Sequence, residues 1–258
     1  MNIEMGQIPL TEFDRDKTAI IEATKHIENF SPPEHCVMPL YGSLIKKLKK
    51  DGRLEKIYEL EMVSLAPIEV YTLDYGDKPV VVANPGLGAP LVAGTFEELI
   101  ALGCRKFVAC GSAGVLKSEL KRGAIVIPRS AVRDEGTSYH YCPPSRVIEM
   151  DREVVGTLEA VLAKHGIKYE IGKTWTTDAF YRETKGKVAK RKSEGCLTVE
   201  MECSALMAVA RFRNVVFGQY LAAGDDVSGG EWDPRYVDNK LSFQEKVFWL
   251  SVEACFNL

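Results

Sequence analysis

Two carboxylates, Glu200 and Glu202, stand one residue apart in the otherwise apolar stretch "CLTVEMECSAL" (196–206). A carboxylate can accept hydrogen bonds from two neighbouring sugar hydroxyls, and such charge-assisted bonds are the stronger kind. At a helix start it is also stabilised by the helix dipole, and Met201 offers a soft apolar surface to a furanose ring. We interpret the stretch as a ribose clamp at a strand-to-helix junction, with one of the two carboxylates on the sugar. The plainer alternative is a helix start rich in acids.

Two glycine-rich stretches offer a complementary chemistry. In "NPGLGAP" (84–90) and "CGSAG" (110–114), small residues let backbone amides approach an anion, and Ser112 adds a hydroxyl. Neither stretch matches the P-loop or the dinucleotide fingerprint. Together they predict a cradle for one small anionic or hydroxylated ligand. The alternative is a pair of ordinary tight turns.

A proton donor is expected in "AAGDDVSG", where Asp225 and Asp226 follow an apolar run. A partly buried aspartate beside another carboxylate should have a raised pKa, which suits a general acid. Either aspartate could fill this role. A capping or turn aspartate is the alternative.

The segment "VRDEGTSYHYCPPSR" (132–146) is too polar for a core. Long loops in compact domains are usually functional, so Arg133, Glu135, Ser138 and His140 are candidate polar contacts to a ligand. A surface loop held by its own hydrogen bonds explains the composition equally well.

These stretches lie between alternating strand and helix signals. Helical spacing with a terminal glycine predicts helices over 89–103 and 153–166, and a third carries an apolar stripe from Phe243 to Ala254. The alternation predicts an α/β fold with a parallel or mixed sheet and helices on both faces. Ligands bind such sheets at the carboxyl ends of strands, where we expect the glycine-rich and aspartate stretches to lie. Short apolar runs rich in Val and Ile predict strands at 78–84, 106–110, 124–128, 169–175 and 215–223.

Composition narrows the classes of function. The chain has 258 residues, a formal net charge of −3 and one basic run, Lys46 to Arg53, that we interpret as a solvated helix face, so no nucleic-acid surface is expected. No apolar stretch approaches the ~20 residues of a membrane span. Seven scattered cysteines without a CxxC pair indicate reduced thiols in a cytoplasmic protein. The four histidines show no ligand spacing, so no metal is expected. No linker or repeat divides residues 1–258, which we expect to form one domain.

The blocks "NPGLGAPLVAGTFEELIALGCRKFVACGSAGVL", "AVRDEGTSYHY", "TTDAFY", "TVEMECSAL" and "GDD" occur in the order seen in the nucleoside phosphorylase/uridine phosphorylase family. The chain resembles this family over roughly residues 36 to 235. The resemblance implies a three-layer α/β/α sandwich with a central mixed sheet, and cleavage of the N-glycosidic bond of nucleosides. It further implies a nucleoside and phosphate as small-molecule partners, no metal or organic cofactor, and a cytoplasmic homo-oligomer, either a dimer or a hexamer.

The resemblance also implies roles for individual residues. Glu202 would bind the ribose hydroxyls with Met201 packed on the sugar, and Asp225 would protonate a purine base as it leaves. The loop with Arg133 and His140 looks closer to the uridine-cleaving branch. Catalytic roles are implied for Asp225 and Glu202, and substrate contacts for Gly88, Ser112, Ala113, Gly114, Arg133, His140, Phe180, Arg182, Glu200 and Met201.

Three departures from the family pattern concern the phosphate and the base. "MPLYGSL" (38–44) stands where the family has Gly-Asp-Pro and then Arg, Ala109 replaces a second Arg, and "RETKG" (182–186) replaces the Gln and Arg that read a pyrimidine. A phosphorylase would need another cation, such as Arg133, Arg182 or a lysine of a neighbouring subunit. We expect phosphorolysis to ribose 1-phosphate and free base. A hydrolytic nucleosidase and a non-catalytic nucleoside-binding protein are the alternatives, and either base class fits.

Overall fold

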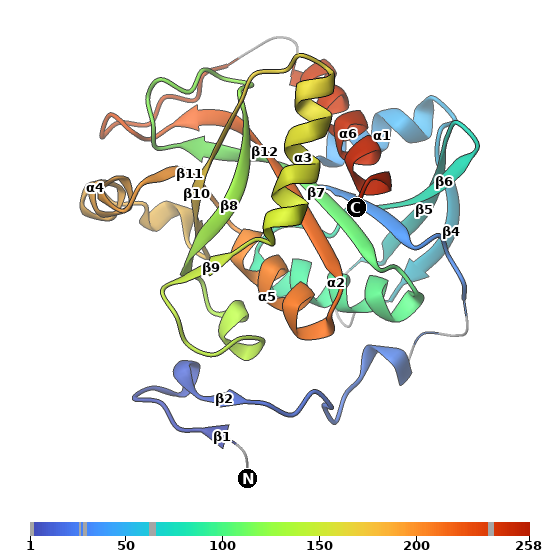
Figure 1. The fold of residues 1–258 in the computed structure, drawn as a ribbon, viewed down its shortest axis with the longest axis horizontal. Coiled ribbons are helices and arrows are strands. Elements are labelled where there is room, and N and C mark those ends of the chain that lie inside the picture. The colour runs from blue at the N-terminus through green and yellow to red at the C-terminus, as the bar shows by residue number, and fades with distance from the viewer. Residues whose placement is uncertain (1–2, 26, 28–29, 62–65, 237–239) are drawn as a thin grey trace.

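A ten-stranded mixed sheet dominates the computed structural model, which describes residues 3–25, 27, 30–61, 66–236 and 240–258 (Figure 1). The strands lie in the order β11-β10-β8-β12-β7-β3-β6-β5-β4, with β9 beside β8, and β1 and β2 form a separate small sheet. The strands are β1 Ile3–Glu4, β2 Phe13–Asp14, β3 His35–Pro39, β4 Glu55–Leu60, β5 Ile68–Tyr75, β6 Lys78–Ala83, β7 Lys106–Val115, β8 Ile125–Asp134, β9 Val147–Glu149, β10 Tyr169–Thr177, β11 Cys196–Glu200 and β12 Val216–Asp226. The helices are α1 Gly42–Lys50, α2 Ala89–Leu102, α3 Arg152–Lys164, α4 Lys185–Ser193, α5 Cys203–Arg213 and α6 Lys240–Phe256, with short 3₁₀ turns η3 Thr137–His140 and η4 Phe180–Arg182 among the connections.

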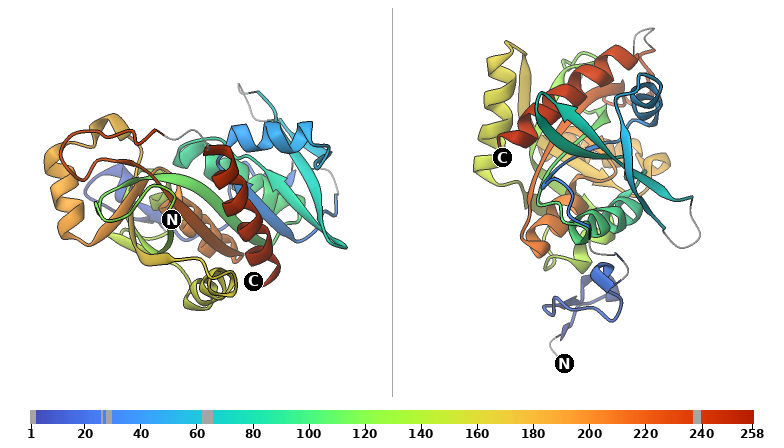
Figure 2. Two further views of the ribbon diagram at one scale, coloured as in Figure 1. Left: turned by 90° about the horizontal axis from the view of Figure 1, so that it is seen from above. Right: turned by 90° about the vertical axis from the view of Figure 1, so that its right-hand side faces the viewer.

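Helices cover both faces of this sheet, as the sequence predicts. On β12, the position of Gly218 faces Val154 and Leu158 of α3, while the neighbouring Phe217 packs on Phe96 of α2. α3 contacts α6 on the first face, and α2 contacts α5 on the second. Figures 1 and 2 show the resulting three layers, which confirm the expected α/β/α sandwich.

The strand directions bring four strand ends to one edge. β3, β6, β7 and β12 run parallel, whereas β8, β10 and β11 run parallel to one another and antiparallel to that group where β8 meets β12 and β11 meets β7. Because carboxyl ends of parallel strands share an edge, the residues after β3 and β6 lie beside the ends of β7 and β12.

The predicted helices are confirmed, and α2 stops at Gly103, whose φ of 130° suits only glycine. The predicted end of the 78–84 strand is confirmed to within one residue, but the strands predicted at 106–110, 124–128 and 215–223 continue for three or more residues beyond their predicted ends. "GSAG" and "GDD" are not turns after strands but the last residues of β7 and β12, where Ser112 pairs with Ala222 and Ala113 with Ala223. Similarly, β8 continues through Asp134 and includes the start of the presumed 132–146 loop. These polar segments belong to the strands because they pair with neighbouring strands on both sides. The short apolar runs in the sequence do not predict this pairing.

A second contact between β11 and β7 closes a ring of five strands, β11-β10-β8-β12-β7. Here Thr198 lies opposite Val115, and Val199 lies opposite Gly114. A Cβ atom at Gly114 would come within 2.9 Å of the Val199 Cγ1 atom, so only glycine lets the two strands meet. The ring places the end of β11, with Glu200, next to the end of β7.

Two further observations concern the cysteines and the helices. The seven cysteines are all free and buried. Within the described ranges, no helix has the length and apolar character to cross a bilayer.

We predict that Gly114→Ala lowers the free energy of unfolding by roughly 1–3 kcal/mol, because the added methyl group must push β11 away from β7. The matched control is Gly156→Ala in α3, where nothing lies within 4 Å of the new methyl group. This control should be stabilising by about 0.5–1 kcal/mol. Urea denaturation of both variants measures the difference, and equal stabilities would contradict the closed ring.

Candidate active site

Glu202 occupies the N-cap position of α5 and is almost completely buried. Its Oε1 atom accepts a hydrogen bond of 2.7 Å from the backbone N–H of Gly88, and its Oε2 atom accepts one of 3.3 Å from the N–H of Met201. Gly88 is the N-cap residue of α2, with a φ of 87° that favours glycine. One carboxylate therefore joins the starts of two helices.

The carboxylate of Glu200 has a structural role. Its Oε2 atom accepts hydrogen bonds from the backbone N–H groups of Glu202 and Cys203, at 2.7 and 2.6 Å. Its Oε1 atom accepts from the hydroxyl of Thr176 on β10, at 2.6 Å. Both oxygens of Glu200 thus hold the turn between β11 and α5, and this turn presents Glu202.

Burial raises the pKa of Glu202, and burial together with the charge of Glu202 raises the pKa of Glu200. The two carboxyl groups titrate as a pair. No ion pair neutralises Glu202 among the described residues. Positive charge that develops on a nearby group would therefore be strongly favoured, since fixed charges act strongly in a site that excludes water.

The end of β7 forms the next part of the site. Ala113 is buried and Gly114 half-buried, whereas Ser112 is exposed and its hydroxyl is open to a ligand. Close to Ser112 lies Tyr41, after β3, whose hydroxyl is buried and forms no well-oriented hydrogen bond to any described residue. Burial raises the pKa of Tyr41 well above its ordinary value, so this hydroxyl stays neutral and is free to donate. Sequence reasoning missed Tyr41, which carried no signal beyond its place in "MPLYGSL".

The two aspartates at the end of β12 have different hydrogen-bond partners. The Oδ2 atom of Asp225 accepts a hydrogen bond of 2.8 Å from the indole N–H of Trp232, and its Oδ1 atom lies 4.0 Å from the position of a Cβ atom at Gly114. Asp226 instead pairs with Arg235 and accepts from the N–H of Ser228 at 2.7 Å. Asp225 is therefore the aspartate that faces the ends of β7 and β11.

The sequence-based expectation that adjacent aspartates raise each other's pKa is wrong for Asp226. Burial works to raise its pKa, but the hydrogen bonds from Ser228 and the charge of Arg235 outweigh burial and lower it. Asp226 is thus an ionised structural partner of Arg235.

Several predicted contact residues lie elsewhere. The guanidinium of Arg133 is buried in its own loop, where it donates to the hydroxyls of Ser138 and Ser145 and to the carbonyl groups of Pro143 and Cys142. A role on phosphate would require all of these bonds to break. His140 is exposed at the end of η3. The loop instead acts through Glu135, which accepts from the hydroxyl of Ser204 on α5 at 2.8 Å and so braces the helix behind Glu202.

On η4, Phe180 is 47% exposed and contacts Tyr181, with ring centroids 4.1 Å apart. Arg182 is exposed and forms no side-chain hydrogen bond or ion pair within the described part of the chain. Phe180 thus presents a free aromatic face, and Arg182 is not held in the site.

Ala109, where the family has an arginine, is completely buried on β7 between Met38 of β3 and Gln219 of β12. Gln219 is also completely buried, and its amide has no hydrogen-bond partner among the residues described. No described lysine or arginine forms a hydrogen bond or ion pair with Ser112 or Glu202. The site as built by these residues has neutral donors where a cation was expected.

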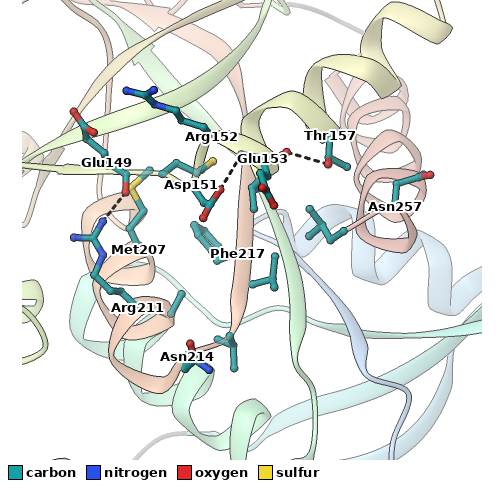
Figure 3. Close-up of a pocket in the computed structure, with 16 residues that line it drawn as sticks. Glu149, Asp151, Arg152, Glu153, Thr157, Met207, Arg211, Asn214, Phe217 and Asn257 are labelled. Atoms are coloured by element: carbon teal, nitrogen blue, oxygen red, sulfur yellow. Dashed lines mark hydrogen bonds between the residues drawn. The ribbon is translucent and has the colours of Figure 1, made fainter.

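A cavity of about 860 Å³ lies at the other end of β12, between α3 and α5, and includes Phe217 (Figure 3). Two of its polar side chains are bound within the cavity wall: Arg211 donates to the carbonyl of Glu149, and Asp151 accepts from the N–H of Glu153. Size alone would favour this cavity, but it lies at the start of β12, whereas Asp225 lies at the end of that strand, near the ends of β7 and β11.

The chain belongs to the phosphorylase superfamily, whose sequence profile matches residues 42–247. The uridine phosphorylase of Escherichia coli strain K12 is 28% identical over 176 residues, which cover 61% of this chain and 70% of that enzyme. The solved structure of a purine nucleoside phosphorylase from Toxoplasma gondii has a TM-score of 0.73 at 22% identity, covering 88% of this chain and 92% of the other. A 5′-methylthioadenosine/S-adenosyl homocysteine nucleosidase from Campylobacter jejuni has a TM-score of 0.69 at 18% identity, covering 86% and 98%. The family resemblance is confirmed, and the chain is a nucleoside-processing enzyme by family.

We predict that Glu202→Gln reduces kcat/KM for a nucleoside by about 30- to 1,000-fold, because it loses a charge that stabilises the transition state. Glu200→Gln should mainly lower the free energy of unfolding, by about 1–2 kcal/mol, because its amide N–H₂ cannot accept from the turn. Steady-state kinetics and urea denaturation of both variants separate the two roles. A larger loss of kcat/KM in Glu200→Gln than in Glu202→Gln would show that the assignments are reversed.

Proposed function

We propose that this protein cleaves the N-glycosidic bond of nucleosides with phosphate, releasing ribose 1-phosphate and the free base. The observation that carries the proposal is the buried Glu202 carboxylate, held by the Gly88 amide and without a counter-charge among the described residues. Such a group is suited to ribose hydroxyls, because their hydrogen bonds to it strengthen as the sugar becomes positive.

The chemistry then follows from the arrangement. Glu202 holds the ribose hydroxyls, Met201 packs on the sugar, and Phe180 lies against the base. As the bond between C1′ and the base nitrogen breaks, its electron pair stays with the base, which takes a proton from the side of Asp225. A phosphate oxygen then bonds to C1′ from the side of Ser112.

Phosphate as the nucleophile is supported by the donors that surround its expected position. The Gly88 amide at the start of α2 is taken by Glu202, but the first turn of α2 itself carries no acidic residue, and its dipole favours an anion nearby. The hydroxyls of Ser112 and Tyr41, which lie close to each other, are two further neutral donors. The similarity to a relative named uridine phosphorylase also supports phosphate as the nucleophile.

Hydrolysis is the second candidate, and a specific observation favours it. Ala109 and the internally bonded Arg133 leave the described site without a guanidinium, and a bidentate pair with phosphate is hard to replace by neutral donors. A neutral site of this kind would suit water in place of phosphate.

We predict that nucleoside cleavage depends on phosphate, with a high KM for phosphate because the dianion lacks a bidentate partner. The experiment supplies uridine, inosine, guanosine and adenosine with phosphate and after its rigorous removal, and assays ribose 1-phosphate and free ribose separately. Free ribose formed at an undiminished rate without phosphate would establish hydrolysis instead. No base released from any nucleoside under either condition would favour the non-catalytic binding protein.

We also predict that Asp225→Asn lowers kcat on a purine nucleoside by roughly 100-fold or more with little change in KM, since it removes the carboxyl group expected to protonate or hydrogen-bond the leaving base. Asp226→Asn is the matched control and should affect stability more than turnover, because it breaks the contact with Arg235. Comparable losses of kcat in the two variants would refute the distinction between the aspartates.

A further inference from the structure

A second carboxyl group, that of Glu183, lies close enough to Asp225 for the two charges to interact. Glu183 follows η4, and its backbone N–H donates to the carbonyl of Phe180 at 3.1 Å, which fixes it next to the expected base-stacking residue. Its half-buried side chain lines a cavity of about 510 Å³ between α4 and residues 227–232. Trp232 lines the same cavity and donates to Asp225, so the cavity borders the base end of the site.

The Glu183 carboxyl has no pairing partner in the part of the chain that the structure describes. Within the described ranges, its side chain forms no hydrogen bond and no ion pair. Lys192 of α4, which lines the same cavity, donates instead to the carbonyl of Ser228 at 2.9 Å. Lys185 packs its aliphatic chain against the position of Gly230.

The charges around Glu183 come from three elements. η4 itself carries the exposed Arg182, and α4 contributes the two lysines that line the cavity. The end of β12 and the following segment contribute Asp225 and the exposed Glu231. Burial first, and the charge of Asp225 second, raise the pKa of Glu183 to about 7. Near neutral pH, this carboxyl group therefore holds a proton for much of the time.

We propose that Glu183 is a second proton donor to the leaving base and acts beside Asp225. This inference rests on the proposed cleavage of nucleosides. As phosphate oxygen bonds to C1′, the bond from C1′ to the base nitrogen breaks and its electron pair stays on the base. The carboxyl proton of Glu183 moves to the base, and the resulting carboxylate takes a proton from solvent before the next turnover. The substrates that need Glu183 are nucleosides whose base leaves poorly as an anion.

The test compares Glu183→Gln with the wild type on two substrates across pH. On a natural nucleoside, kcat/KM of the wild type should fall as pH rises through about 7, because the donor loses its proton. Glu183→Gln should lose this pH dependence and be roughly 100-fold slower below pH 7. On 4-nitrophenyl riboside, whose leaving group needs no proton, the variant should remain close to the wild type.

Two controls separate this role from a structural one. Glu231→Gln removes an exposed carboxylate from the rim of the same cavity and should leave both activities unchanged. Thermal melts supply a measurement independent of activity. Because the folded-state pKa of Glu183 is raised, its contribution to stability is present below about pH 4.5 and is lost as pH rises towards about 7. In Glu183→Gln, this decrease in stability between about pH 4.5 and pH 7 should be absent.

The outcomes are distinct. The role of Glu183 would be overturned if kcat/KM of Glu183→Gln still fell as pH rises through about 7. It would also be overturned if the variant lost the same factor of kcat/KM on the nucleoside and on 4-nitrophenyl riboside. Neither result would contradict nucleoside cleavage itself. Equal effects of Glu231→Gln and Glu183→Gln would also overturn it, as a general effect of charge. A wild type that releases no base from any nucleoside would overturn the proposed function and this inference together.

Discussion

The hydrogen bond from the Gly88 amide to the Glu202 carboxylate is the contact on which the rest of the site depends. It spans 114 positions in the chain and joins the start of α2 to the start of α5, two helices on the same face of the sheet. A buried carboxylate is costly unless backbone donors satisfy it. This bond both lowers that cost and fixes where the charge stands. Glu200, bound to Thr176 and to the turn itself, holds the other side of the same junction.

The sheet makes this junction possible by departing from a simple parallel order. β11 belongs to the group of strands that runs against β7, yet its end pairs with the end of β7 at Gly114. The closed ring thus brings Glu202 from one group of strands beside Ser112 and Asp225 from the other. This arrangement requires glycine where the strands approach closely, as at Gly114, because a side chain there would separate the strands. The site and the fold share these positions, so changes there should affect stability and activity together.

The sequence predicted much of this because the relevant signals are local. The spacing in α2 and its terminal Gly103 indicate the helix, and the acid-rich junction indicates Glu202. Other features depend on partners distant in the chain. Arg133 is polar and suitably placed in the sequence, but only the folded loop shows that its own carbonyl groups bind it. Glu183 lies in the "RETKG" stretch that stands in place of the family's base-reading residues, but the sequence shows neither that its carboxyl lacks a partner among the described residues nor that it interacts with Asp225.

The central claim is that Glu202 holds the sugar while neutral donors around Ser112 hold the nucleophile. A crystal structure with ribose 1-phosphate bound tests this claim most directly. We expect both ribose hydroxyls within hydrogen-bond distance of the Glu202 carboxylate, with the phosphate group at Ser112 and the N-terminus of α2. A sugar bound away from Glu202, or a phosphate group held by Arg133 after its loop has opened, would contradict the claim.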